Sequence, residues 1–427
     1  MSSHNEKTHL PPPLDLSLWS KLPAVLMILG AALCIVGLGM DQQVFGLSWL
    51  LAFMFYLSLA LGALFLVMIH HLTDAGWSVG IRRFCEHIAS LLFPWLAILF
   101  IPVLLLAPKI YAWLTLPATD HLIRARWPVF TCAGFVVVSA LLFGVWWLLT
   151  SRLRYWSLRQ DVTGDALCTH KMRFHSGWGI VAFALTLTGA SVFWMQAVQY
   201  QSFSAMYGVY FFSNCAWLAL ATVYVIAALL QRQRILAGVL QEHYFYFIGV
   251  QFFAFTVFSA YTEFAQYFVV WNANMPEETF WYLIREHRSW WCLSMILIFG
   301  KFFLPFFVIL PVKVKSSLKI MIPVCLWAGL MQFGDLAFNI LPALPGYHFP
   351  LKMLWLPFGC LAFMGGFLGW VFVNKFKSHP PYPQKDPRLL EAMGVGVNVD
   401  DDDYWTREPD EADEEISGTA PTTGGRS

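Results

Sequence analysis

The sequence predicts an all-α, polytopic membrane protein with about ten transmembrane helices and both termini on the cytoplasmic side. Of its 427 residues, 58% are hydrophobic and only 12% are charged, and the mean hydropathy is +0.59. Soluble domains carry about 25% charged residues, so this chain has too few charges to cover a water-facing surface. Apolar runs near membrane-spanning length recur along the chain, and their number gives the number of helices.

Each run approximates the ~20 residues that a helix needs to cross ~30 Å of hydrocarbon. The runs are too long and too uniformly apolar for the alternating strands of a membrane barrel. We therefore expect ten spans, at about 23–40, 47–69, 88–107, 127–149, 177–198, 206–230, 245–270, 290–311, 318–340 and 352–373. Kinks are expected at four prolines within them, Pro94, Pro102, Pro305 and Pro323.

The distribution of Lys and Arg between the loops predicts the orientation. The terminal flanks and the loops on their side carry 15 of these residues, and the loops on the opposite side carry 5. Cytoplasmic loops are enriched in Lys and Arg, so both termini should lie inside the cell.

Three regions follow from these patterns. Residues 1–22 form a polar cytoplasmic segment without a cleavable signal pattern, so the first span should be retained. Residues 23–377 form the transmembrane domain. Residues 378–427 form an acidic, Gly- and Pro-containing cytoplasmic tail, which is expected to be largely disordered or to lie against a partner.

Three ionisable residues fall inside spans, where a charge costs several kcal/mol and marks a candidate functional site. Glu263 lies in the seventh span, Lys301 near the middle of the eighth and Asp335 in the outer half of the ninth. Polar residues on the same helix faces extend this set to Gln266, Tyr267 and Asn339. They predict a polar pocket for a quinone, or steps in a proton path, toward the outer leaflet. An ion pair that only locks the bundle is the structural alternative.

A second polar group lies at the cytoplasmic end of the second span and just beyond it. Its members are His70, His71, Asp74, Glu86 and His87. Histidine titrates near neutral pH, so these residues are candidates for proton uptake from the cytoplasm. Helix capping and interfacial polarity would explain them equally well.

Several classes of chemistry are disfavoured. The histidines lie at span ends or in loops, whereas a haem-carrying bundle needs facing histidines at membrane depth. The eight cysteines are scattered without a CxxC pair, which argues against a metal site. No phosphate-binding loop or hydrolase motif occurs, and no long basic run predicts a nucleic-acid partner. We expect no metal and no covalently bound cofactor.

Several motifs carry a family resemblance. Residues 266–282 read QYFVVWNANMPEETFWY, and residues 60–73 read ALGALFLVMIHHLT. Residues 301–307 read KFFLPFF, and Asp335, His379-Pro380 and Lys385-Asp386-Pro387 also match. Across nearly all of residues 23–390 the chain resembles the NrfD-like (polysulfide-reductase-like) membrane subunits, and within them the ActF-type second subunit of bacterial alternative complex III.

The resemblance implies two four-helix bundles, at about 47–198 and 206–340, flanked by the first and last spans. It also implies a bacterial inner-membrane complex that oxidises a quinol, the reduced form of menaquinone or ubiquinone. The implied partners are an NrfD-like paralogue, an iron–sulfur protein and a multihaem cytochrome c, which hold the iron–sulfur clusters and haem. Subunits of this type are assigned to quinone binding, proton handling or scaffolding.

The sequence departs from the family pattern at three places. Relatives carry an acidic cluster at the end of the fifth span, where residues 192–200 contain no carboxylate. Relatives carry an apolar residue and a histidine where this chain has Glu263 and Lys301. The family's proton route therefore does not transfer directly to this chain.

The residues leave three functions open. The first is a non-catalytic membrane subunit of a quinol-oxidising respiratory complex, which borders a quinone site or handles protons. The second is a secondary transporter, because ten helices in two repeats with charges at membrane depth also describe many transporters. The third is a purely structural scaffold subunit.

Overall fold

The structure, a computed structural model, describes residues 17–116, 128–232, 240, 242–286, 289–347, 350–386 and 388–389. Within these ranges every regular element is a helix, and ten helical stretches are long and apolar enough to cross a membrane. The predicted all-α, multi-pass membrane class is confirmed. The ten stretches overlap the ten expected spans in the same order, and we number the spans accordingly.

Most spans consist of one long helix. These helices are α1 (Ser17–Met40), α2 (Gln42–Leu72), α7 (Cys132–Thr163), α8 (Ala166–Ala190), α9 (Tyr207–Arg232), α10 (Glu242–Ala273), α15 (Leu318–Ile340) and α16 (Trp355–Lys377). Three short helices lie at the bundle ends: α5 (Ala107–Ile110), α11 (Pro276–Arg285) and α14 (Val312–Ser316).

Two spans are broken near their middle by a π-helical turn, and a third π turn, Ser191–Met195, follows α8 at the end of span 5. Span 3 consists of α3 (Val79–Ala89), a π turn at Leu92–Leu96 and α4 (Ala97–Leu105). Span 8 consists of α12 (Ser289–Leu297), a π turn at Ile298–Phe303 and α13 (Leu304–Ile309). Pro94 lies within the first break, and Pro305 follows the second, as expected for residues that cannot donate a helical hydrogen bond.

Local sequence explains where several helices begin and end. Asp41 caps α2, since its Oδ1 accepts from the backbone N–H groups of Gln43 and Val44 at 2.8 and 3.1 Å. Asp165 caps α8 in the same way. Gly164, between α7 and α8, has φ +69°, a conformation that glycine adopts without strain at a helix C-terminus.

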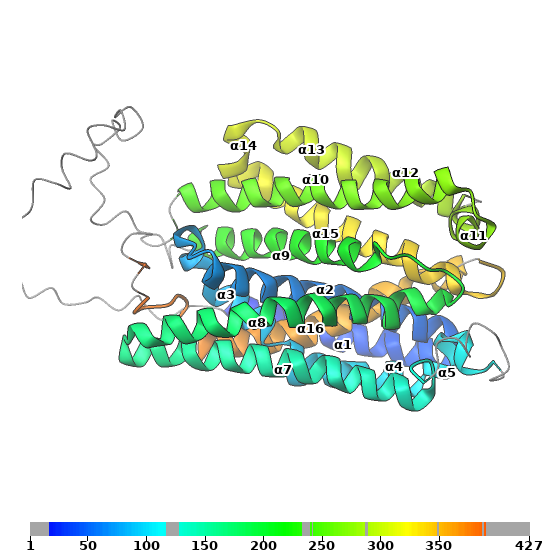
Figure 1. The fold of residues 1–427 in the computed structure, drawn as a ribbon, viewed down its shortest axis with the longest axis horizontal. Coiled ribbons are helices and arrows are strands. Elements are labelled where there is room, and N and C mark those ends of the chain that lie inside the picture. Colours follow the sequence, from blue (N-terminus) through cyan, green and yellow to red (C-terminus); the bar gives the residue numbers. More distant parts are fainter. Residues whose placement is uncertain are drawn as a thin grey trace, which may run out of the picture.

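The centre of the molecule is the pair α2 and α9, which pack against each other. They are also the spans with the largest buried share of their apolar windows. α3, α4 and α8 pack on α2, and α7 packs on α8; α10 and α15 pack on α9, and α12 and α13 complete that side. α1 packs along α16, and this pair lies against α2 (Figure 1).

The two ends of the bundle differ. At one end lie α3, α14 and the last residues of α16, and at the other lie α5 and α11 (Figure 1). We call these the tail end and the α11 end. The acidic tail expected from residue 378 begins with a segment, 378–389, that packs on the tail end through Lys385, Asp386 and Arg388. Beyond 389 the expected tail lies outside the described residues.

Candidate functional site

The three ionisable residues expected inside the membrane meet in one cluster. The Lys301 ammonium donates a hydrogen bond to the Glu263 carboxylate, and its Nζ lies 3.2 Å from Asp335 Oδ2. The side chains of Lys301 and Asp335 are 3% and 6% exposed, whereas that of Glu263 is 33% exposed. We call these three residues the acid–lysine cluster. Glu263 is the member that reaches the outside of the chain.

Three helices position the cluster. Glu263 lies on α10, ten residues before its end at Ala273, which is about 15 Å from the α11 end of that helix. Lys301 lies on the π turn of span 8, and Asp335 lies on α15. A π turn adds one residue to the helix and rotates the following side chains. π turns within α-helices are frequently found at functional sites.

Two tyrosines of α9 extend the cluster toward the α11 end. The Tyr210 hydroxyl donates to Asp335, and the Asn339 amide donates to the Tyr210 hydroxyl at 2.8 Å. The Tyr207 hydroxyl in turn donates to Asn339 Oδ1 at 3.1 Å. All three side chains are buried. A continuous hydrogen-bonded chain therefore runs from Tyr207 to Lys301 and Glu263.

Tyr207 is also part of the wall of a small recess at the α11 end. The recess is lined by polar and aromatic side chains: Gln196, Ser202, Phe203, Ser204, Tyr207, Gln266, Val270, Glu278, Trp281 and Tyr282. It has room for water but not for a quinone ring. The recess and the acid–lysine cluster are thus joined through Tyr207 and Asn339.

Of the other expected site residues, two join this arrangement and one does not. Asn339 belongs to the hydrogen-bonded chain, and Gln266 lines the recess. Tyr267 does not join the cluster, because its exposed ring packs edge-on against Tyr282, with 5.2 Å between ring centroids.

Arg285 fixes the α11 end of the cluster in place. Its guanidinium donates to the backbone carbonyls of Trp281, Phe338 and Asn339 at 2.8, 2.8 and 3.0 Å. It also donates to Gln199 Oε1 at 3.0 Å. The bonds to Phe338 and Asn339 satisfy carbonyls in the last turn of α15, where helical donors run out and Pro342 has no N–H. α11 is thereby held over the recess.

The acid–lysine cluster is not balanced in charge. Two carboxylates face one ammonium, so one negative charge is left uncompensated when both acids are ionised. An unpaired charge away from water costs several kcal/mol. One bound proton makes the cluster neutral, and the neighbouring donors Tyr210 and Lys301 can stabilise either protonation state.

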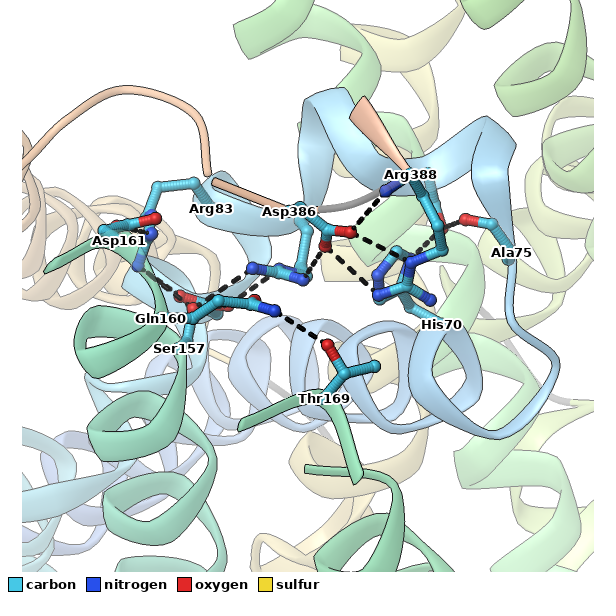
Figure 2. Close-up of polar contacts among 12 residues, drawn as sticks. His70, Ala75, Arg83, Ser157, Gln160, Asp161, Thr169, Asp386 and Arg388 are labelled. Carbon is cyan, nitrogen blue, oxygen red and sulfur yellow. Dashed lines mark hydrogen bonds and ion pairs between the residues drawn. The ribbon is translucent and has the colours of Figure 1, made fainter. Parts of the chain in front are cut away.

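The tail end contains a second ionic network, which is balanced. The side chains of Arg82 and Arg83 on α3 are fully buried and share Glu86, at 3.2 and 2.8 Å. Arg82 also pairs with Asp386 of the docked segment, and Arg83 with Asp161 of α7. Figure 2 shows Arg83 with Asp161 and the neighbouring Ser157.

Arg388 completes this network. It binds Asp386 and reaches Asp74 at 2.7 Å, while Arg173 of α8 lies 2.9 Å from the same Asp74 carboxylate. Burial alone would raise the pKa of the Asp386 carboxyl, but Arg82 and Arg388 hold that pKa below its usual value. Four guanidinium groups therefore face four carboxylates: Arg82, Arg83, Arg173 and Arg388 with Asp74, Glu86, Asp161 and Asp386.

The structure does not gather the five candidates for proton uptake into one site. His70 and His71 are buried neighbours, and His70 Nδ1 lies 2.6 Å from the Ser78 hydroxyl. Neither ring nitrogen of His71 has a hydrogen-bond partner among the described residues. Asp74 and Glu86 are held in the ionic network, and His87 lies apart from it beside Arg154.

The tyrosines of α9 and the docked segment are the functional candidates that sequence reasoning missed. Tyr207, Tyr210 and Asn214 follow helical spacing along the buried face of α9, which is a weak signal in an aromatic-rich span. The partners of Arg82 and Arg83 could not be assigned, because Asp386 is about 300 positions away in the chain.

No protein-family model matches the chain, and a search of curated proteins gives no match.

Proposed function

We propose that the chain is an integral membrane subunit of a quinol-oxidising respiratory electron-transfer complex and that its acid–lysine cluster binds and releases protons. The observation that carries the proposal is the uneven charge of the cluster: Glu263 and Asp335 share the single ammonium of Lys301. A cluster of this composition is neutral only with one proton bound. It is therefore suited to hold a proton at membrane depth and to give it up.

The hydrogen-bonded chain supports an exchange route at the α11 end. Water entering the recess would contact Tyr207 and Gln266, and Asn339 holds the Tyr207 and Tyr210 hydroxyls on either side of its amide. An amide orients these phenols but does not readily relay a proton. Glu263, one-third exposed and one turn from Gln266, is the group best suited to exchange protons directly.

The motif resemblance supports the complex. In this reading an NrfD-like paralogue, an iron–sulfur protein and a multihaem cytochrome c carry the redox centres, in a bacterial inner membrane. A quinone, menaquinone or ubiquinone, accepts and delivers electrons in the assembled complex. The recess is too small for its ring, so we assign proton chemistry, and not quinone binding, to this recess.

A secondary transporter is less well supported. Such proteins have helices broken at corresponding positions of the two repeats. Here the π turns of the described spans lie in spans 3, 5 and 8, which do not correspond when spans 2–5 are matched to spans 6–9. Copurification separates the readings, since a respiratory subunit brings haem and iron–sulfur partners and a transporter does not.

The test removes the charge of each acidic side chain while keeping the shape of that side chain. In the purified complex, Asp335→Asn and Glu263→Gln should each lower the number of protons released per quinol oxidised, because the cluster then lacks one of its two proton acceptors. Quinol oxidation should slow by roughly tenfold or more, within the usual contribution of a positioned acid–base group. Proton release is followed with a pH indicator and electron transfer with cytochrome c.

Glu242→Gln is the matched control, since Glu242 is an exposed carboxylate at the tail end of the same helix. It should leave both quantities unchanged. Unchanged rate and stoichiometry in both cluster variants would refute the proton role. Loss of the assembled complex, with normal turnover in whatever remains, would favour a scaffold.

A further inference from the structure

A group of basic side chains at the tail end lies outside the balanced ionic network. Its members are His87 of α3, Arg154 of α7, Lys375 of α16 and His379 of the docked segment. Arg154 Nη1 lies 3.3 Å from His87 Nδ1, and the rings of His87 and His379 are 6.0 Å apart between centroids. We call these four residues the basic cluster. Four separate elements bring them together.

Their hydrogen bonds are all to neutral groups. Lys375 Nζ donates to the Ser90 hydroxyl and carbonyl at 2.9 and 3.2 Å. His379 Nδ1 lies 2.8 Å from the Ser378 hydroxyl. No carboxylate forms an ion pair with Arg154 or Lys375 in the part of the chain that the structure describes. Glu86, whose charge acts on Arg154, is already held by Arg82 and Arg83.

A buried, unsatisfied nitrogen gives a second indication of a missing ligand. His87 is fully buried, and its Nε2 has no hydrogen-bond partner among the described residues. Arg154, Lys375 and His379 above it are half-buried. Uncompensated cations that converge on one place favour an anion there.

The level of the basic cluster in the bundle fits the polar boundary of a bilayer. Lys375 lies in the last turn of α16, and Arg154 follows the apolar part of α7 by about one turn. Trp147 lies two turns earlier on the same face of α7, is exposed, and contacts the exposed Phe93 at 5.8 Å between ring centroids. A polar head at Arg154 would therefore have an apolar surface directly beneath it.

We propose that the basic cluster binds the phosphate of an anionic phospholipid, whose acyl chain lies along Phe93 and Trp147. Arg154 and Lys375 supply the charge, and His379 supplies a further ring nitrogen at the rim. Basic side chains between helices at this level are suited to lipid phosphates, since each cation near the membrane surface strengthens the binding of an anionic lipid by about fivefold. The site is independent of the proton chemistry proposed above.

The test compares two double variants of the full-length protein by native mass spectrometry, titrated with dioleoyl phosphatidylglycerol. Arg154→Gln with Lys375→Gln should weaken binding by roughly 20-fold, about fivefold for each cation removed. The control is Arg152→Gln with Lys377→Gln, which removes two exposed charges two residues away on the same helices. It should change the affinity by less than about threefold. Dioleoyl phosphatidylcholine should bind the wild type much more weakly.

Trp147→Ala keeps every charge of the basic cluster and should weaken lipid binding while leaving the weak binding of inorganic phosphate unchanged. Arg154→Lys should retain most of the affinity. Equal losses in the two double variants would show diffuse surface charge and overturn the proposal. Wild-type affinity in the variant with Arg154→Gln and Lys375→Gln would also overturn it. Full competition by millimolar inorganic phosphate would identify a free-phosphate site and overturn the lipid assignment.

Discussion

Lys301 is the residue on which the acid–lysine cluster depends. Its ammonium is the only cation that contacts Glu263 and Asp335 within the described residues. Removing one partner of a buried ion pair leaves an uncompensated charge, which costs more than the pair contributed. Because Asp335 is more buried than Glu263, it would bear most of that cost.

We predict that Lys301→Met lowers the free energy of unfolding by about 3–5 kcal/mol, because both carboxylates lose their cation. Adding Asp335→Asn to Lys301→Met should recover a large part of this loss, since the more buried of the two carboxylates is then removed. Thermal unfolding of the protein in detergent measures both effects. Lys319→Met, at an exposed position of α15, serves as the control. Additive effects of the two cluster substitutions would contradict the coupling.

At the scale of elements, the docked segment 378–389 joins parts of the chain that are far apart in sequence. Asp386 pairs with Arg82 of α3, Lys385 Nζ donates to the Val162 carbonyl at 2.7 Å, and the Gln384 N–H donates to Asp161 at 3.2 Å. These contacts hold the end of α7 against α3. The buried guanidinium of Arg82 is tolerated because this segment supplies a carboxylate.

We predict that Asp386→Asn releases this segment. The substitution leaves Arg82 and Arg388 with less negative charge nearby and should cost about 3 kcal/mol of docking free energy. Hydrogen exchange of residues 378–389 should then become faster by a factor of about 100. The Lys377→Gln variant, which changes an exposed charge at the last residue of α16, directly before the segment, should exchange like the wild type. Unchanged protection in Asp386→Asn would show that apolar packing alone docks the segment.

At the scale of the whole molecule, α1 and α16 close the bundle through glycines. A side chain at Gly366 would meet the backbone N of Met27 at 2.4 Å, and one at Gly30 would meet that of Phe363 at 2.3 Å. Small residues allow helices in membranes to approach closely. The same contact brings Cys34 and Cys360 together, with 3.7 Å between their sulfur atoms.

We predict that Gly366→Leu separates α1 from α16, because the added atoms overlap backbone that cannot move aside. Copper phenanthroline should cross-link Cys34 to Cys360 readily in the wild type and at least tenfold more slowly in this variant, as measured by mass spectrometry of the linked peptides. Gly144→Leu is the control, since a Cβ there meets nothing within 4 Å. Equal cross-linking in Gly366→Leu and wild type would disprove the close packing.

The fold class could be predicted because the lipid environment requires long apolar helices. A span must be apolar along ~20 residues whatever it packs against, so the ten runs were visible in the sequence. Glu263, Lys301 and Asp335 stood out for the same reason, as charges within those runs. Their membership of one cluster was not visible, since it depends on how α10, span 8 and α15 are rotated against each other.

Local patterns were less informative about which polar groups meet. Tyr267 shares a helix face with Glu263 in the sequence, yet it packs on Tyr282 instead. Tyr207 and Tyr210 looked like ordinary aromatic residues of a span, and their hydrogen bonds to Asn339 and Asp335 appear only in the packed bundle.

By itself, the sequence determined that this protein is a bundle of about ten membrane-spanning helices and which of their residues carry charge, because the free energy of placing each segment in lipid is a local property. Only the tertiary structure decided that two acids share one lysine and that Asp386 neutralises Arg82. It also decided that Arg154 and Lys375 have only neutral hydrogen-bond partners among the described residues. These are pairings between distant segments, and a charge is stabilised by whichever group the packing brings near it.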